Sequence, residues 1–180
     1  MPICKRLIRL TTVDGVGPGP VRGNLIMKTT FFAVVGLALA AAAPAVAQDY
    51  NSTPNYGEVR LAPGFTPDPH LVNMRAGGTI DASTRFNECR GFITDQPDLR
   101  LYWDGKGTMN LRISAVSNAD TTMVVNGPNG EWYCDDDSGD GSNPLVTLSP
   151  VAGRYEIWVG TYSNGETKPA VLSISEVTNF

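Results

Sequence analysis

The sequence predicts an all-β fold, an antiparallel β-sandwich or jelly-roll-like arrangement formed by a single domain. Apolar and polar side chains alternate with a period of two through most of the chain after position 48. Short turn motifs rich in glycine, proline and asparagine separate these runs, and none of them has the periodicity of an amphipathic helix. Eight or nine short strands spaced in this way favour two packed sheets, with a closed barrel as the alternative.

The predicted strands follow one another along the chain. Their apolar, alternating positions are Leu99, Leu101 and Trp103; Leu111, Ile113 and Ala115; Tyr155, Ile157 and Val159; and then Val171, Leu172, Ile174 and Val177. The clearest hairpin joins TTMVV to EWYCD through the turn NGPNG. In that turn Pro128 fixes φ and Gly130 can adopt the left-handed conformation.

Residues 27–47 have the layout of a secretory signal peptide. Lys28 supplies a short positive region, an apolar run follows, and Ala45-Val46-Ala47 provides a cleavage site with small residues. The apolar run is too short to favour a membrane anchor, so cleavage after Ala47 is expected. The sequence therefore predicts a bacterial protein that is exported to the periplasm or beyond, with no membrane span once the signal is removed.

The rest of the chain divides around this signal. Residues 1–26 have no apolar periodicity and are predicted to be a disordered upstream extension. Residues 48–56, QDYNSTPNY, are polar and are predicted to form a flexible lead-in, and residues 57–180 are predicted to form the sandwich. This length suits one compact domain, and we expect a monomer.

The predicted mature chain is acidic. Residues 48–180 carry 9 basic and 17 acidic side chains, a net charge of about −8 with His70 neutral. This charge excludes nucleic acid as a natural partner. It is typical either of a surface that keeps an exported protein in solution or of acidic loops that bind divalent cations.

Two cysteines remain after the signal, Cys89 and Cys134. An even number of cysteines in an exported chain predicts a disulfide, which would stabilise the domain by about 3 to 4 kcal/mol. A pair of free, buried thiols is the alternative. There is no C-x-x-C motif, which argues against a redox catalyst or a thiolate zinc site.

The stretch EWYCDDDSGDGSNP, residues 131–144, is the most acidic part of the chain. Asp136, Ser138, Asp140 and Gly141 fit the first half of a calcium-loop pattern, but the twelfth position is Thr147 instead of glutamate, which excludes an EF-hand. Neighbouring carboxylates repel one another, and a calcium ion would remove that repulsion. The alternative is a solvated loop whose aspartates form Asx turns.

The region around this loop resembles the bacterial pre-peptidase C-terminal domain. The matching motifs, within about residues 98–177, are Asp120-Thr121, Pro128-Asn129-Gly130, Asp136-Asp137, and the strand from Ala152 to Val159. The resemblance implies a jelly-roll-like sandwich of the type appended to secreted peptidases, without chemistry of its own, and some members of that family bind calcium. It adds Asp120 to Asp136, Asp137 and Asp140 as candidate calcium ligands, and it suggests a secreted peptidase as a partner.

Aromatic side chains suggest a different binding mode. Trp103, Trp132 and Trp158 lie in neighbouring predicted strands, where exposed rings would form a platform for an extracellular peptide or polysaccharide. The alternative is that these rings fill the space between the sheets. A continuous exposed strip of rings would distinguish the two.

A small serine hydrolase is the remaining alternative. Asp137-Ser138-Gly139 resembles part of the nucleophile motif of chymotrypsin-like proteases, and His70 is the only histidine. However, the chain is too short for two barrels, and the carboxylates around Ser138 would oppose an oxyanion. We therefore expect no enzymatic activity; a hydrolase would require Ser138 and His70 within hydrogen-bonding distance.

Overall fold

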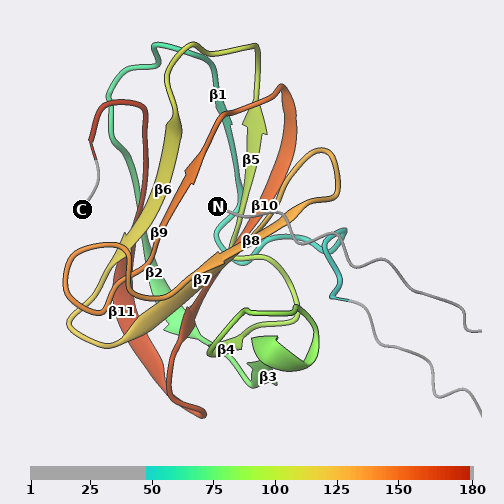
Figure 1. The fold of residues 1–180 in the computed structure, drawn as a ribbon, viewed down its shortest axis with the longest axis vertical. Coiled ribbons are helices and arrows are strands. Elements are labelled where there is room, and N and C mark those ends of the chain that lie inside the picture. Colours follow the sequence, from blue (N-terminus) through green and yellow to red (C-terminus); the bar gives the residue numbers. More distant parts are fainter. Residues whose placement is uncertain (1–47, 179–180) are drawn as a thin grey trace, which may run out of the picture. The chain divides into compact units, whose positions relative to one another are not determined.

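The computed structural model describes residues 48–178, and almost all of this part of the chain is strand or turn (Figure 1). Eleven strands among these residues form two sheets, and the helical structure there is a single 3-10 turn at Ala82–Thr84 (η1). The prediction of an all-β sandwich is confirmed. The predicted extension at 1–26 and the predicted signal peptide at 27–47 lie outside the described residues.

The larger sheet has seven strands and is organised around β10 (Gly153–Thr161). One path through the sheet runs in the order β1-β5-β10-β4-β3, and β7 also pairs with β10 and carries β8 at its other edge. The bounds are β1 Glu58–Leu61, β3 Ile80–Asp81, β4 Phe92–Ile93, β5 Leu99–Trp103, β7 Thr121–Asn126 and β8 Trp132–Asp135.

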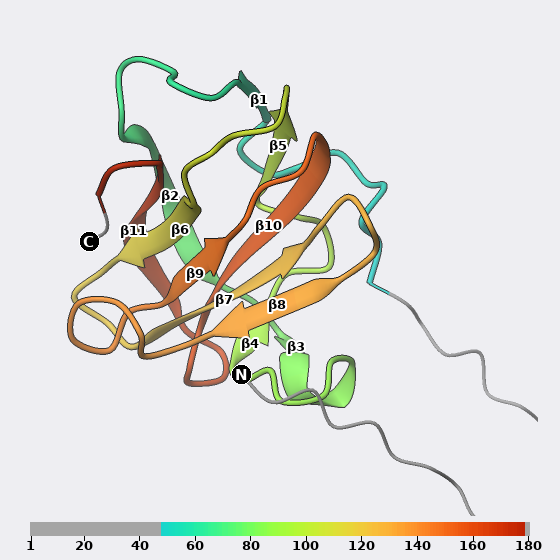
Figure 2. The same cartoon turned by 45° about the horizontal axis from the view of Figure 1, so that its top comes forward.

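The smaller sheet has four antiparallel strands in the order β2-β11-β6-β9. Their bounds are β2 His70–Gly77, β6 Leu111–Val116, β9 Leu145–Leu148 and β11 Thr167–Ser175. Figure 2 shows these strands on one side and β10, β7 and β8 on the other. Among the described residues, no helix is long and apolar enough to cross a membrane.

The core lies between the two sheets and uses the side chains that the alternation predicts. Its fully buried members include Leu101, Trp103, Leu111, Ile113, Ile157, Leu172 and Ile174. Val171 and Val177 are the exceptions. Val171 is half-buried and lies outside the core cluster, and Val177 follows β11 and is exposed. Burying a large aliphatic side chain stabilises the fold by about 1.5 to 3 kcal/mol, so these facing positions fix the register of both sheets.

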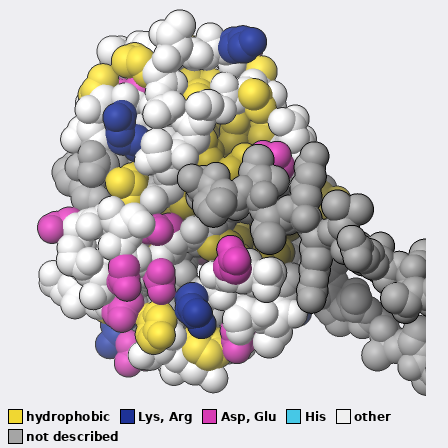
Figure 3. All heavy atoms as spheres, in the orientation of Figure 1, with side chains coloured by type: hydrophobic (Ala, Val, Ile, Leu, Met, Phe, Trp, Pro, Cys, Tyr) yellow, Lys and Arg dark blue, Asp and Glu magenta, His cyan; other side chains and the backbone are white. Residues whose placement is uncertain are grey.

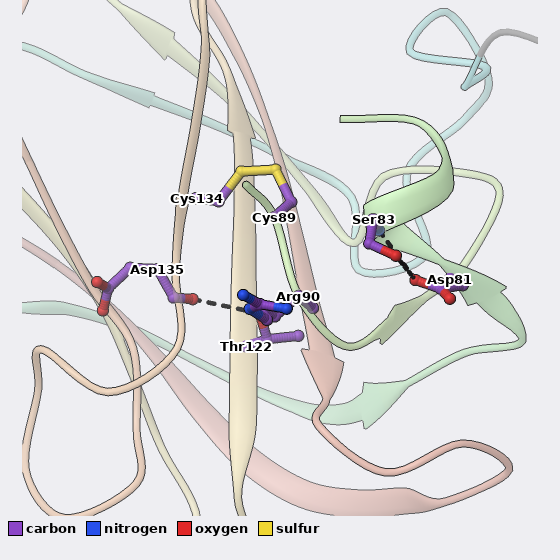
Figure 4. Close-up of a disulfide and its surroundings, with 7 residues drawn as sticks. All are labelled: Asp81, Ser83, Cys89, Arg90, Thr122, Cys134 and Asp135. Atoms are coloured by element: carbon purple, nitrogen blue, oxygen red, sulfur yellow. Dashed lines mark hydrogen bonds between the residues drawn. A yellow bond between two sulfur atoms is a disulfide. The ribbon is translucent and has the colours of Figure 1, made fainter. Parts of the chain in front are cut away.

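A second apolar cluster covers the outward face of the larger sheet. It joins Trp158 of β10 and Val124 of β7 to the segment after β3, which contributes Ala82, Phe86 and Cys89. The predicted disulfide between Cys89 and Cys134 is present, with the two Cα atoms 5.3 Å apart (Figure 4). This segment therefore packs against the sheet and is also covalently attached to β8.

The pairing of β1 differs from the expected antiparallel pattern. β1 pairs with β5 in parallel, with Glu58 opposite Arg100 and Leu61 opposite Trp103. The long connection between them, which includes β2 of the other sheet, makes a parallel pair possible, since parallel strands need a crossover.

Residues 48–56 form turns that contact the sandwich. The Gln48 side chain is buried and donates hydrogen bonds to the Thr94 and Asp95 carbonyls, and the Asn55 and Tyr56 amides bond to the carbonyls of residues 97 and 98. The sequence predicts a flexible lead-in here because it contains no apolar pattern. Its contacts instead use polar groups, which no periodicity marks.

Candidate functional site

The β7–β8 hairpin forms one side of the candidate site, and its conformation follows from its sequence. Asn126 pairs with Trp132 across the hairpin, and the Gly127 amide donates to the Glu131 carbonyl at 2.8 Å to close the turn. Gly130 has a φ of 76°, in the left-handed region that favours glycine. The hairpin predicted from TTMVV-NGPNG-EWYCD is confirmed.

An open groove of about 660 Å³ lies beside this turn. The turn forms one wall, and the start of β10 with the residue before it contributes Ala152 to Arg154. Tyr50 completes the lining; it belongs to residues 48–56, which we call the N-terminal segment. The other side chains that line it are Asn126, Pro128, Asn129 and Trp132. The groove thus combines two aromatic rings, two amides and one guanidinium, the mixture of apolar surface and a few polar groups found in ligand-binding sites.

The ring of Trp132 is half-buried and held by its neighbours. Phe86 stacks on it with ring centroids 4.1 Å apart, and the centroid of the Trp158 ring, in β10, lies 5.6 Å away. Aromatic pairs at these distances contribute about 0.5 to 1.5 kcal/mol beyond their burial. Since the disulfide attaches the Phe86 segment to the neighbouring Cys134, the position of Trp132 is fixed both covalently and by packing.

Tyr50 is 41% exposed, and two arginines contact it and its neighbours in the chain. Arg100 donates to the carbonyls of Tyr50 at 3.2 Å and of Ser52 at 3.0 Å. Arg154 donates to the Asn51 side chain at 2.9 Å, and its guanidinium lies 5.7 Å from the centre of the Tyr50 ring. The N-terminal segment is therefore the wall of the groove that depends on these polar contacts.

An ion cluster with a buried centre, Arg100 and Glu156, lies beside the groove. Glu156 is 1% exposed, and its Oε1 accepts a hydrogen bond from Nε of Arg100 at 2.5 Å. Nε of Arg154 forms an ion pair with the same oxygen at 3.0 Å. Glu58 makes a second ion pair with Arg100 at 2.8 Å. Burial raises the pKa of Glu156, whereas its hydrogen bond with Arg100 and the charges of the two arginines act to lower it. The cluster holds two cations and two anions, which makes it electrically neutral overall.

The aromatic platform predicted from three tryptophans needs correction. Trp103 is 2% exposed and points into the core, and Trp158 is fully buried under the second apolar cluster. Only Trp132 of the three lines the groove. Trp158 is on the outward face, as the alternation indicates, but the segment after β3 covers it. The sequence gives no signal for that covering segment.

The acidic loop between β8 and β9 is closed by one of its own carboxylates. Asp135 accepts hydrogen bonds from the Ser138 amide at 2.9 Å, from the Ser138 hydroxyl at 2.6 Å and from the Leu145 amide at 2.8 Å. Asn143 is buried and bonds to the Ser117 and Asp140 carbonyls. Asp135 thus has the Asx-turn role that the sequence leaves open for this loop.

The predicted calcium ligands come from two loops. Asp120 immediately precedes β7, whereas Asp136, Asp137 and Asp140 lie between β8 and β9. Burial raises the pKa of Asp120, and the negative charges of Asp137 and then Asp136 raise it further. Asp140 is exposed farther along the loop. Among residues 48–178, no three acidic, histidine or cysteine side chains form a group that could hold a metal. The calcium site stays a prediction.

The hydrolase alternative is not supported by the positions of its residues. His70 begins β2 at one edge of the four-stranded sheet, and Ser138 precedes β9 at the other edge. Three strand spacings correspond to about 14 Å. The Ser138 hydroxyl donates to Asp135 instead. The order of the strands therefore separates the proposed nucleophile from its base.

Sequence reasoning did not identify Tyr50, Asn126 or Arg154 as site residues. The alternation marks Asn126 and Arg154 as outward-facing, because Val125 and Tyr155 point into the core. Tyr50 belongs to no alternating pattern. It is held at the groove by the hydrogen bond that Arg100 donates to its backbone carbonyl. A polar segment held in this way has no periodic pattern to detect.

No protein-family model matches the chain, and neither does any curated protein sequence. Among solved structures, the chain is similar to the pre-peptidase C-terminal domain of a collagenase from Bacillus anthracis, with 14% identity and a TM-score of 0.41 over 69% of this chain and 100% of that chain. It is also similar to PliG, a periplasmic inhibitor of g-type lysozyme from Aeromonas hydrophila, with 15% identity and a TM-score of 0.33 over 66% and 96%. At these values neither structure indicates what this chain binds.

Proposed function

We propose that this chain is an exported, non-catalytic binding module and that the groove beside the β7–β8 turn holds its ligand. The groove itself is the observation that carries the proposal, because it combines Tyr50, Trp132 and Arg154 in one open depression. The disulfide between Cys89 and Cys134 supports export, since such bonds persist in oxidising compartments.

The chemistry of the lining supports binding without catalysis. The described residues around the groove include no carboxylate, imidazole, thiol or serine hydroxyl in contact with the open space. General acid–base and nucleophilic catalysis need such groups within about 3 Å of the reacting atoms. What the groove offers is ring surface and hydrogen-bonding groups, which orient a ligand but do not transform it.

A ligand screen followed by nuclear magnetic resonance tests the proposal. The purified, nitrogen-15-labelled protein is titrated with mixtures of neutral oligosaccharides, short peptides and carboxylate compounds. We expect the indole signal of Trp132 and the side-chain amide signals of Asn126 and Asn129 to move, and those of Trp103 and Trp158 to move far less because both are buried. Shifts confined to the smaller sheet, or no shift at these three residues, would reject the groove as the binding site.

A further inference from the structure

From the chemistry of the same groove we infer that its ligand is a neutral oligosaccharide, bound through ring stacking and amide hydrogen bonds. This inference rests on the proposed function, because it assigns a ligand class to that site. It depends on three properties of the groove: its two aromatic rings, its charge balance and the pairing of the strands that form its floor.

The rings and amides match the two kinds of surface that a sugar presents. A pyranose ring has apolar faces of C–H groups, which pack on an aromatic face, and a rim of hydroxyl groups that both donate and accept hydrogen bonds. Trp132 and Tyr50 supply rings at the groove. Asn126 and Asn129 supply amides, each with two donors and one acceptor, which can satisfy neighbouring hydroxyls.

Trp132 is suited to this role because it is already ordered. Its contacts with Phe86 and Trp158 hold the ring in place before a ligand arrives. A preorganised ring loses little side-chain entropy on binding, which matters for a ligand whose individual contacts are weak. Tyr50 is more exposed, and its backbone is held by Arg100.

The charges at the groove favour a neutral ligand. Arg154 is the charged side chain that lines it, and its Nε already forms an ion pair with Glu156 at 3.0 Å. Glu156 and Glu58 together neutralise Arg100 and Arg154. An anionic polysaccharide would find no unpaired cation here, and it would be repelled by the net charge of about −8 on residues 48–180.

The strand pairing disfavours a peptide. Extended peptides are commonly bound by adding a strand to a free sheet edge, where unpaired backbone groups await a partner. Asn126 at the groove floor is paired on one side with Glu156 and on the other with Trp132. Arg154 is paired with Tyr102 on one side. At Asn126 the floor therefore presents a side chain to a ligand instead of a free strand edge.

Calorimetric titration with defined oligomers tests the inference. The probes are the neutral hexasaccharides of glucose, mannose and N-acetylglucosamine, an anionic hexagalacturonate, and a proline-rich dodecapeptide. We expect at least one neutral hexasaccharide to bind with a dissociation constant that stays within about twofold between 50 mM and 500 mM sodium chloride, because no ion pair forms. We expect neither the anionic oligomer nor the peptide to bind with comparable affinity.

Two tyrosine variants locate the site. We expect Tyr50→Ala to weaken binding about tenfold, the loss expected for one stacked ring. Tyr162→Ala is the matched control, because Tyr162 is 48% exposed and lies after β10 away from the groove lining, and it should leave binding within about twofold. Unfolding curves of both variants show whether each remains folded.

The outcomes separate the inference from the proposed function. Binding of hexagalacturonate or the peptide that is lost in Tyr50→Ala would overturn the neutral oligosaccharide and retain the groove as a binding site. Binding of a neutral hexasaccharide that Tyr50→Ala leaves unchanged would overturn both. Absence of binding by every probe would overturn the oligosaccharide inference, and the resonance screen then decides whether the groove binds another class.

Discussion

Nε of Arg100 lies 2.5 Å from Oε1 of Glu156, and both side chains are buried on the outward face of the larger sheet. The same arginine donates to the carbonyls of Tyr50 and Ser52. This buried cation is therefore part of the neutral ion cluster and also holds the wall of the proposed binding groove. This relationship couples the stability of the sandwich to the shape of the groove.

Arg100→Met should destabilise the domain by about 3 to 5 kcal/mol, because it leaves the buried Glu156 without its main partner. Urea unfolding measures the loss. Arg60→Met is the control: Arg60 is exposed on β1 and lies over the Tyr102 ring, so its replacement should cost about 1 kcal/mol or less. Equal losses of unfolding free energy in the two variants would show that the ion pair between Arg100 and Glu156 does not stabilise the domain more than an exposed arginine does.

A double variant refines this test. Arg100→Met combined with Glu156→Leu removes both charges together, and it should recover a large part of the stability that Arg100→Met loses. The carbonyls of Tyr50 and Ser52 would still lack their donor. We therefore expect the double variant to be stable but to bind the groove ligand more weakly than the native chain.

The stability of the domain should fall as pH rises from about 4 to about 6, through the contribution of Asp98. Burial raises the pKa of Asp98 to about 6, although hydrogen bonds from Asn55 and the Val159 amide lower it. The native state then binds a proton that the unfolded state, with a pKa near 3.8, has released. This contribution, on the order of 3 kcal/mol, is present below pH 4 and lost above pH 6.

Asp98→Asn isolates that contribution. The variant cannot titrate at this position, so the difference in unfolding free energy between native and variant chains should change with pH across the window from 4 to 6. Asp95→Asn is the control, because Asp95 is exposed three residues earlier. A native-minus-variant difference that stays constant across this window contradicts the assignment.

The sandwich core could be predicted from sequence because burial between two sheets imposes a period of two. Leu101, Ile113 and Ile157 follow it and are all buried. Glu156 and Trp158 are buried as well, although the same period places them outward, because the N-terminal segment and the segment after β3 cover that face. Segments that are held by hydrogen bonds to carbonyls and by a disulfide need no periodic apolar pattern in their sequence, so periodicity does not reveal them.

The same reasoning explains the candidate site. The β7–β8 hairpin and Trp132 could be predicted because turn residues and strand propensity act locally. The groove could not, since Tyr50, Asn126 and Arg154 come from three separate segments and meet only after the sheets form. The parallel pairing of β1 with β5 could not be predicted from the sequence either, because the direction of pairing depends on the path of the chain between the two strands.

Removing the disulfide should destabilise the domain by about 4 kcal/mol in the chain-entropy model. Cys89 and Cys134 are separated by 45 residues, and the bond closes the loop between them. Cys89→Ala combined with Cys134→Ala should lower the unfolding midpoint and increase hydrogen exchange around Phe86, which stacks on Trp132. Dithiothreitol should destabilise the native chain and leave the double variant unchanged; an insensitive native chain would contradict a structural role for the bond.

Calcium should raise the thermal midpoint if the predicted acidic site binds it, because the neighbouring carboxylates of Asp120, Asp136 and Asp137 repel one another and a divalent cation relieves that repulsion. At a hundred times the dissociation constant the gain would be about 2.7 kcal/mol. Thermal melting in millimolar calcium, repeated with chelator, measures this gain. The double variant Asp136→Asn with Asp137→Asn should abolish it. The control Asp104→Asn, at an exposed position distant in sequence, should keep it. An unchanged midpoint would leave the hydrogen bonds of Asp135 as the sufficient cause of the loop's conformation.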